Sequence, residues 1–453
     1  MKTPAIILRI SLLALLLSTV ASCINDPSPD RYRVPEFAAV DVDESVPGSV
    51  GFTCSVSSME QLADYGVYFT TGTAGSRTKV SGLRTADNAF TVRISELLAG
   101  ATYSCLFFIS NGKVEVLSTP LRYLAPETPA PDRRPMRLRV SPSAGGQVSL
   151  PVRGALECVV DWGDGSREAV KADYGAGSLA SGCLAHQYTS PGPFEVSVSG
   201  KVSALSSYGL PQLSCVEAVL DWGDTGLSDI SYAFDGQTKL ETVAAPGEQS
   251  FAAVASARSA FSGTALEQIP AGLFSGCPSG CDYTKVFAGC KRLKAVPEEA
   301  FPDADRLTQS FSGCEALTKL PARLLGDGSR LTELQETFAA CAALEAVPAT
   351  LLDNCPNLTK LVSTFSGCSA LKEIPAQLFD SCRRLGIAEG VFMNCASLAG
   401  ESPYTEINGT KVHLYERSAH PEAFAPVTSG YLCFFGCGGL SDYAAIPDNW
   451  KKP

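Results

Sequence analysis

Residues 338–391 decide the fold, because two consecutive stretches of equal length repeat one pattern. The first reads FAACAALEAVPATLLDNCPNLTKLVST from Phe338, and the second reads FSGCSALKEIPAQLFDSCRRLGIAEGV from Phe365. In both stretches a Cys, a Leu and a Pro follow the Phe at the same positions. Such a fixed interval predicts a stack of similar units, each of which buries its apolar side chains only against its neighbours.

The same pattern extends over most of the C-terminal half of the chain. Its Phe residues are separated by 27, 26, 24, 27, 27 and 27 residues, and they are Phe234, Phe261, Phe287, Phe311, Phe338, Phe365 and Phe392. Within one repeat, we expect residues 371–374 to form a short strand with Leu371 and Ile374 facing inward. Pro375 suits the first turn of a short helix, because that position needs no backbone N–H.

These residues resemble the BspA-like leucine-rich repeats of bacterial surface proteins, and the resemblance covers residues 206–440. It implies a leucine-rich repeat solenoid, with Trp222 covering the open face of the first repeat. Asn408-Gly409 predicts a hairpin in an insertion at 401–417, and residues 441–453 form a C-terminal tail.

The N-terminus reads as a lipoprotein signal peptide, residues 1–22. A basic residue, Lys2, precedes the short apolar run Ile10–Val20, which is too short to span a bilayer comfortably. The following Val20-Ala21-Ser22-Cys23 resembles the bacterial lipobox, which implies that Cys23 is acylated and that residues 23–34 form a tether. The resemblances imply an outer-membrane lipoprotein, held in the lipid bilayer through Cys23 and expected at the cell surface.

Two β-rich segments lie between the tether and the repeats. Residues 35–125 alternate runs such as VGFTCSV and ATYSCLFFIS with turn clusters, which predicts a β-sandwich. The stretch Leu98–Cys105 (LAGATYSC) resembles part of a fibronectin type III domain. A Pro-rich linker, residues 126–135, follows. Residues 136–205 contain DWGDGS at 161–166 and His186-Gln-Tyr188, which resemble the PKD (polycystic kidney disease) module. The expected fold is therefore mainly β with short helices, as two Ig-like β-sandwich modules followed by the solenoid.

The DWGDGS motif allows two interpretations. A calcium loop of the EF-hand type needs oxygen ligands at positions 1, 3 and 5 and Glu at position 12, but from Asp161 the last three are Gly163, Gly165 and Ala172. A tight turn fits better, because the glycines permit unusual backbone angles and the Asp side chains can bond turn amides. No nucleophile motif accompanies His186, so we expect it to be structural.

The 17 cysteines follow the repeats more than a disulfide framework. Cys290, Cys314, Cys341, Cys368 and Cys395 form one column, and Cys277, Cys355 and Cys382 form a second. Side chains in such columns run side by side, so we expect buried thiols. Cys277 and Cys281 lack partners for a zinc site. The resemblance to immunoglobulin-type domains makes Cys54 and Cys105 a candidate disulfide, and two separate buried thiols are the alternative.

Composition argues against several classes of function. A net charge of -11 without a basic block argues against nucleic-acid binding, and three histidines leave few candidates for acid–base chemistry. No motif indicates a catalytic residue, metal or cofactor, so we expect a non-enzymatic binding or adhesion protein. Its candidate binding face has mixed charge, which favours a protein partner: Lys294, Thr318, Lys319, Glu345, Lys372 and Glu373. The alternative is an accessory glycan-binding role, for which Tyr404, Tyr415, Tyr431 and Tyr443 are the aromatic candidates.

Overall fold

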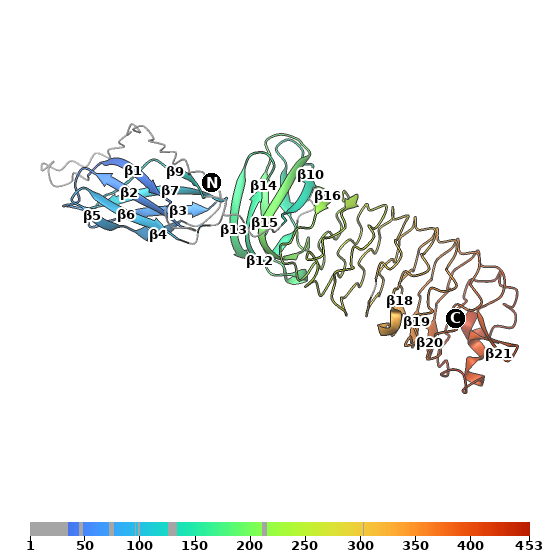
Figure 1. Ribbon diagram of the computed structural model, residues 1–453. Helices are drawn as coiled ribbons and strands as arrows, with labels where there is room; N and C mark the ends of the chain where they lie inside the picture. Colours follow the sequence, from blue (N-terminus) through green and yellow to red (C-terminus); the bar gives the residue numbers. More distant parts are fainter. Residues whose placement is uncertain are drawn as a thin grey trace, which may run out of the picture. The chain divides into compact units, whose positions relative to one another are not determined.

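The computed structural model describes residues 35–453 apart from 45–48, 72–76, 96, 98–99, 126–133, 211–214 and 302. The fold is mainly β with few helices, and the chain divides into two compact units (Figure 1). One unit comprises residues up to Ala130 together with Arg167–Ala169, and the other comprises the rest. The signal peptide, the lipidation site Cys23, the tether and most of the linker lie outside the described residues.

The first unit contains two antiparallel sheets that share a core. One sheet has the order β1 (Phe37–Asp43), β2 (Val50–Val56), β6 (Ala89–Ile94) and β5 (Leu83–Ala86). The other has the order β4 (Thr78–Ser81), β3 (Asp64–Thr71), β7 (Thr102–Ser110) and β8 (Glu115–Leu117), and β9 (Leu121–Leu124) also pairs with β7. Phe52 of β2 and Phe107 of β7 pack edge to face with ring centroids 5.2 Å apart, so the sheets meet through their apolar faces.

Cys54 and Cys105 lie in different sheets of this unit, and both are buried free thiols. The candidate disulfide is therefore absent from the structure, and the alternative of two separate thiols describes it. Burial raises the pKa of Cys105 to about 12, which keeps that thiol protonated at neutral pH.

The second unit begins with a six-stranded sheet. Its order is β13 (Arg167–Asp173), β12 (Val152–Asp161), β15 (Phe194–Leu205), β10 (Met136–Val140), β16 (Val216–Asp221) and β17 (Thr242–Val243). Strands β11 (Gln147–Leu150) and β14 (Leu184–Gln187) form a separate two-stranded sheet. A 3-10 helix, η2 (Gly177–Leu179), lies between β13 and β14 in the sequence. Strand β16 pairs with β10 on one side and with β17 on the other. The sheet therefore continues past the expected boundary at residue 205 into the repeats, and one apolar core runs from Met136 to Trp450.

The DWGDGS segment is the turn between β12 and β13. Gly163 and Gly165 have positive φ, and the Gly163 amide donates to the Asp161 carboxylate at 3.0 Å. Trp162 is buried and stacks on His186, with ring centroids 4.8 Å apart. The glycines and Asp161 thus shape this turn, and the stacked rings of Trp162 and His186 pack beside it.

Successive repeats pair in parallel along one line. Three short strands form its most regular part: β18 (Glu333–Gln335), β19 (Lys360–Val362) and β20 (Ile387–Glu389). Single parallel bridges extend the line toward the N-terminus, and they link Ala204, Asp229, Ser256, Asp282 and Arg306 in order. A last bridge joins Ile387 to Ser429. Figure 1 shows these repeats as successive coils from about residue 225 onward.

The expected strand at residues 371–374 is wrong, because the strand of that repeat is β20. Leu371 and Ile374 are buried, but the two residues between them are exposed, so the segment does not alternate as a strand does. Pro375 also removes an amide that a continued ladder would need. The short helix after Pro375 is also wrong: the segment forms separate turns, such as the one in which Leu378 donates to the Pro375 carbonyl at 3.1 Å, and no helix forms there.

A column of phenylalanine rings runs through the core of the repeats. Adjacent rings are parallel, with centroids 5.3–5.9 Å apart, and they belong to Phe234, Phe261, Phe287, Phe311, Phe338, Phe365, Phe392 and Phe434. Trp222 packs against the first rings, 6.1 Å from Phe234. Trp450 stacks on Phe434 at 6.3 Å. Trp450 thus covers the last ring, whereas Trp222 lies beside the first two rings, at 6.1 Å from both Phe234 and Phe261, and does not cover the end as expected.

The cysteine column forms hydrogen bonds with the backbone carbonyls of these Phe residues. Each thiol donates to the carbonyl of the Phe in the preceding repeat: Cys341 to Phe311 at 3.2 Å, and Cys368 to Phe338 at 3.2 Å. Cys290, Cys314, Cys395 and Cys437 repeat the contact. Each of these carbonyls also accepts a backbone amide of its own repeat, as Phe311 does from Cys314 and Phe338 from Cys341, so the thiol adds a second hydrogen bond that links neighbouring repeats.

The insertion and the C-terminal tail complete the second unit. Strands β21 (Tyr404–Ile407) and β22 (Thr410–His413) form the predicted hairpin, and both Asn408 and Gly409 have positive φ. A 3-10 helix, η4 (Leu414–Ala419), follows the hairpin, another, η3 (Gly328–Arg330), precedes β18, and α1 (Asp448–Lys451) ends the chain. Within the described part of the chain, no helix has the length and apolar character needed to cross a bilayer.

Candidate functional site

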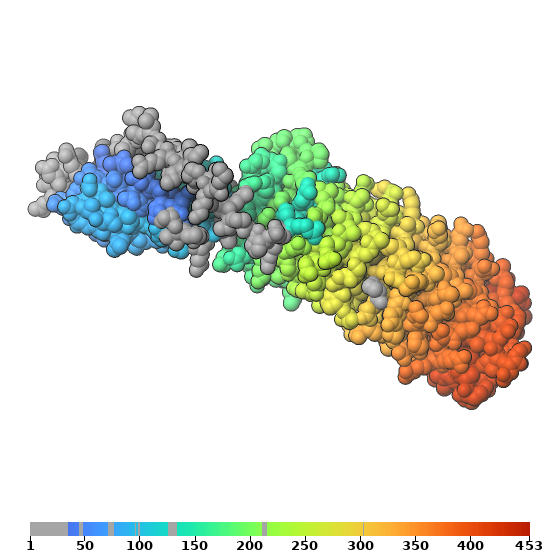
Figure 2. All heavy atoms as spheres, viewed as in Figure 1, coloured from blue at the N-terminus to red at the C-terminus, as the bar shows by residue number. Residues whose placement is uncertain are grey.

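The most extensive candidate surface follows the line of parallel pairing, and we call it the ladder face. It consists of the side chains at the pairing positions: Asp229, Ser256, Asp282, Arg306, Glu333, Lys360, Ile387 and Ser429. These side chains are half-buried or exposed, whereas the residue after each of them is buried. This alternation places one polar row outward and one apolar row in the core. On the side that Figure 2 shows, the repeats form one continuous surface.

The ladder face is hollowed at one place, between Arg306 and Glu333. The hollow has a volume of about 640 Å³, and its lining residues are Asp305, Arg306, Arg330, Thr332 and Glu333. The hollow lies at a gap in the series of parallel bridges. Among the described residues, no bridge joins Arg306 to Glu333. The preceding repeat is also the shortest, with 24 residues from Phe287 to Phe311.

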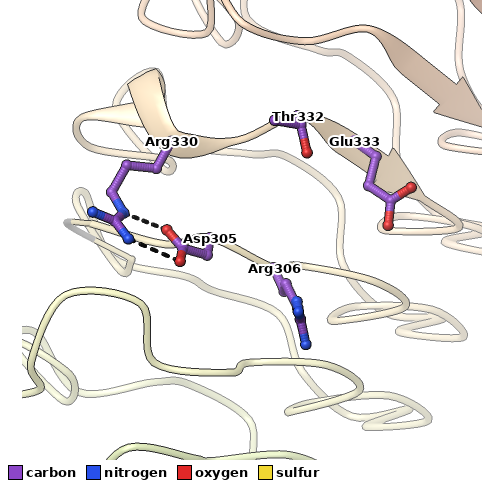
Figure 3. Close-up of a pocket in the computed structure, with 5 residues that line it drawn as sticks. All are labelled: Asp305, Arg306, Arg330, Thr332 and Glu333. Carbon is purple, nitrogen blue, oxygen red and sulfur yellow. Dashed lines mark hydrogen bonds and ion pairs between the residues drawn. The ribbon is translucent and has the colours of Figure 1, made fainter.

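A charge pair forms one wall of the hollow. Arg330 of η3 donates to both carboxylate oxygens of Asp305, and its Nη2 lies 2.9 Å from Oδ2 (Figure 3). This bidentate geometry is rigid and specific. The hydrogen bonds from Arg330 lower the pKa of Asp305, so the carboxylate stays ionised.

Arg306 is the second cation of this site, and unlike Arg330 it forms no ion pair with a described residue. Its side chain is exposed and makes no hydrogen bond or ion pair with any described residue, and in Figure 3 it points away from the Arg330–Asp305 pair. The other cation on the ladder face, Lys360, lies 3.7 Å from Glu333. A guanidinium without a partner is suited to bind a carboxylate from another molecule.

The six residues predicted as a binding face are all exposed, but none lines the hollow. They lie on the segment after the consensus Leu, where Lys294 is 3.1 Å from Glu267 and Lys372 is 2.5 Å from Glu345. Thr318, Lys319 and Glu373 lie on the same segment of their repeats. Two of the three predicted lysines thus already have carboxylate partners. Sequence reasoning missed Arg306 and Arg330, and the 24-residue interval was the signal that could have pointed to them.

Two histidine clusters resemble catalytic arrangements in composition but not in geometry. Asp164 lies 2.7 Å from Nε2 of His186, and Ser166 contacts the same nitrogen at 3.3 Å. A relay needs the acid and the hydroxyl on opposite ring nitrogens. Burial raises the pKa of Asp164, but hydrogen bonds from Ser166 and His186 outweigh this effect and bring that pKa to about 2. The Asp164 carboxylate is therefore ionised at neutral pH.

The second histidine cluster lies beneath the hairpin. Ser402 Oγ is 3.0 Å from His413 Nδ1 and donates to Asp442 at 2.5 Å. Ser402 is only 1% exposed, so a substrate cannot reach its hydroxyl. The cluster ties the insertion to the C-terminal tail.

The four tyrosines considered for a glycan platform do not form an exposed row. Tyr431 is 50% exposed, whereas Tyr404, Tyr415 and Tyr443 are half-buried. Tyr415 stacks on His413 with centroids 5.2 Å apart. Sugar stacking needs open ring faces, and only Tyr431 offers one here.

Comparisons with family models, curated proteins and solved structures found no match for this chain. Among the described residues, no group of three or more His, Cys, Asp or Glu side chains is placed to hold a metal ion.

Proposed function

We propose that this chain is a lipoprotein of the outer membrane, anchored through acylated Cys23 and exposed at the cell surface, that binds a protein partner without catalysing a reaction. In this proposal, residues 35–125 and 136–205 are Ig-like β-sandwich modules of the fibronectin type III and PKD kinds. Residues 206–440 are a BspA-like leucine-rich repeat solenoid that carries the recognition surface.

The parallel ladder supports the solenoid assignment. Neighbouring repeats pair at equivalent residues, such as Glu333 with Lys360 and Lys360 with Ile387. The ring column places equivalent side chains directly above one another. Both features arise when units of one length stack on each other.

The observation that carries the binding function is Arg306, an exposed cation that makes no hydrogen bond or ion pair with any described residue, beside a hollow of about 640 Å³ on the ladder face. Leaving a guanidinium unpaired beside a paired one gives the surface a point of attachment for an acidic side chain. Thr332 is exposed on the same rim and adds a hydroxyl. Among the described residues, no aromatic residue lines the hollow, which disfavours stacking of a sugar ring, and arginine is a residue that protein interfaces favour.

Binding is tested by presenting the purified chain to a panel of extracellular-matrix proteins and to a glycan array. We expect a protein ligand, and we expect Arg306→Ala to weaken its binding about tenfold, or 1.4 kcal/mol. Lys372→Ala is the matched control, because Lys372 is exposed but already paired with Glu345, and it should change the affinity less than twofold. Binding to glycans alone, or a loss confined to Lys372→Ala, would contradict the proposal.

Anchoring is tested separately with Cys23→Ala in cells. The variant should move from the membrane fraction to the soluble fraction, because a protein without its acyl chains has only weak attraction to the bilayer. Protease added to intact cells should cleave the wild-type chain. Resistance in intact cells together with cleavage after lysis would refute surface exposure while leaving the anchor intact.

A further inference from the structure

A second row of side chains lies beside the ladder face. It consists of the residues two positions after each pairing residue, because side chains two apart in a strand lie on the same side. The register supports this row, since Gln335 pairs with Val362 and Val362 with Glu389. Its members are Ser231, Arg258, Thr284, Thr308, Gln335, Val362, Glu389 and Tyr431. The ladder face and this second row together form a strip, two side chains wide, that follows the line of pairing.

The first four repeats of the strip carry only polar side chains. Several of these side chains contact each other: Ser231 Oγ lies 2.7 Å from Ser256 Oγ, and Arg258 lies 3.9 Å from Asp282. Among the described residues of this half, Arg306 is the only charged side chain that makes no hydrogen bond or ion pair. This half therefore ends in a single unpaired cation.

The last four repeats of the strip contain all of its apolar and aromatic side chains. Val362 and Ile387 are half-buried, and Tyr431 is 50% exposed. Tyrosine and arginine are among the residues that contribute most to binding energy in protein interfaces. Tyr431 at one end and Arg306 at the other are thus the two side chains of the strip best suited to anchor a partner.

The charges between these two anchors already have partners within the strip. Lys360 lies 3.7 Å from Glu333, and Ser429 Oγ donates to the Glu389 carboxylate at 2.6 Å. A partner that covers them would not bury a lone charge, which is the costly case. The segment between the anchors is therefore suited to contact apolar side chains through Val362 and Ile387.

The spacing of the anchors limits what can reach both. Arg306 and Tyr431 belong to repeats that are four steps apart in the stack. At about 4.8 Å per step, they lie about 20 Å apart along the strip. An extended chain covers about 3.3 Å per residue, so about six residues span this distance. A straight strip two side chains wide fits an extended chain of that length.

We infer, on the basis of the proposed protein-binding function, that the strip binds an extended segment of the partner with an acidic residue about six positions from a large apolar residue. The carboxylate enters the hollow beside Arg306, where the guanidinium binds it. The apolar residue packs on the ring of Tyr431. The residues between them pass over Val362 and Ile387.

The probe for this site is a phage-displayed library of random peptides of about twelve residues, selected on the purified chain. We expect the selected peptides to carry Asp or Glu about six positions from a large apolar residue. Arg306→Ala and Tyr431→Ala should each weaken the binding of such a peptide about tenfold. The double variant should weaken it about a hundredfold, because the effects of two distant substitutions add as free energies.

Each substitution has a matched control. Arg258→Ala removes an arginine of the same strip that lies 3.9 Å from Asp282, and Tyr208→Ala removes a tyrosine that is 48% exposed and lies outside the strip. Both controls should change the affinity less than twofold. A peptide shortened to omit its apolar residue should still depend on Arg306 but no longer on Tyr431.

The inference is overturned if no peptide is enriched above background, if the selected peptides lack acidic residues, or if Tyr431→Ala changes their affinity less than twofold. A matrix protein whose binding needs Arg306 but not Tyr431 would also overturn it, and would leave the proposed function standing. Binding of glycans alone would contradict the proposed function, whereas the outcome of the peptide selection does not depend on that panel.

Discussion

At the scale of single residues, backbone conformation explains the composition of the repeats better than side-chain chemistry does. The second residue after each column Phe has positive φ, and it is glycine in most repeats, as at Gly289, Gly313 and Gly367. Ala340 adopts the same conformation with a φ of 57°. The left-handed region costs an L-residue with a Cβ about 1–2 kcal/mol, so this alanine is strained.

Ala340→Gly should therefore stabilise the chain. Removal of the Cβ relieves the strain, and the greater freedom of glycine in the unfolded state offsets part of the gain, which leaves about 0.5–1 kcal/mol. Ala340 is exposed, so no packing is lost. Urea unfolding measures the change. The neighbouring Ala339→Gly, where φ is not positive, is the control and should destabilise the chain, and a destabilised Ala340→Gly would show that the strain argument is wrong.

At the scale of elements, the insertion is held to the repeats by one buried charge. Arg417 of η4 is 2% exposed and donates to the carbonyls of Phe379 and Cys382 at 2.9 and 3.0 Å. It also bonds the hydroxyl of Thr405 in β21. Burial lowers the pKa of Arg417 to about 10, so the side chain remains charged at pH 7 and its hydrogen bonds persist.

Arg417→Leu should destabilise the chain by about 2–4 kcal/mol, because the three hydrogen bonds from this buried charged group to Phe379, Cys382 and Thr405 are lost. Limited proteolysis should then cut the insertion at Lys411 before the repeats are cleaved. The control is Arg383→Leu, an exposed arginine in the preceding repeat, which should change stability by less than about 0.5 kcal/mol. Equal protease resistance in both variants would argue against this anchoring role.

The elements that sequence predicted well are those with local signals. Asn408-Gly409 specifies its turn through its own backbone preferences. The Phe and Cys columns repeat many times at nearly constant spacing, so their alignment follows from the sequence. The short strands were misplaced because three residues, such as Lys360–Val362, are too few for alternation to stand out. The hollow could not be derived, because Arg330 meets Asp305 only after two repeats have stacked.

At the scale of the whole molecule, equal repeat lengths make the C-terminal half modular. The repeat from Phe338 to Thr364 has neighbours of the same pattern on both sides, and Phe338 stacks between Phe311 and Phe365 at 5.7 and 5.3 Å. Removal of residues 338–364 would bring Phe365 into the position that Phe338 leaves. Every column would therefore stay in register.

This 27-residue deletion should fold and unfold cooperatively, with a smaller urea m-value than the full chain because less surface is buried. Circular dichroism during urea titration measures both quantities. A deletion of residues 338–350 alone should instead fail to fold the region after it, since it shifts Phe365 and its cysteine column out of register. A folded short deletion would show that register does not control stacking.

Trp222 and Trp450 also allow the repeat core to be followed by intrinsic fluorescence. The chain has three tryptophans: Trp222 packs beside the first two rings of the column, Trp450 stacks on the last ring, and Trp162 lies in the turn between β12 and β13. Indole emission shifts to longer wavelength when its ring becomes hydrated. Chains that keep a single tryptophan would therefore report separately on the opening of each end, without any added dye.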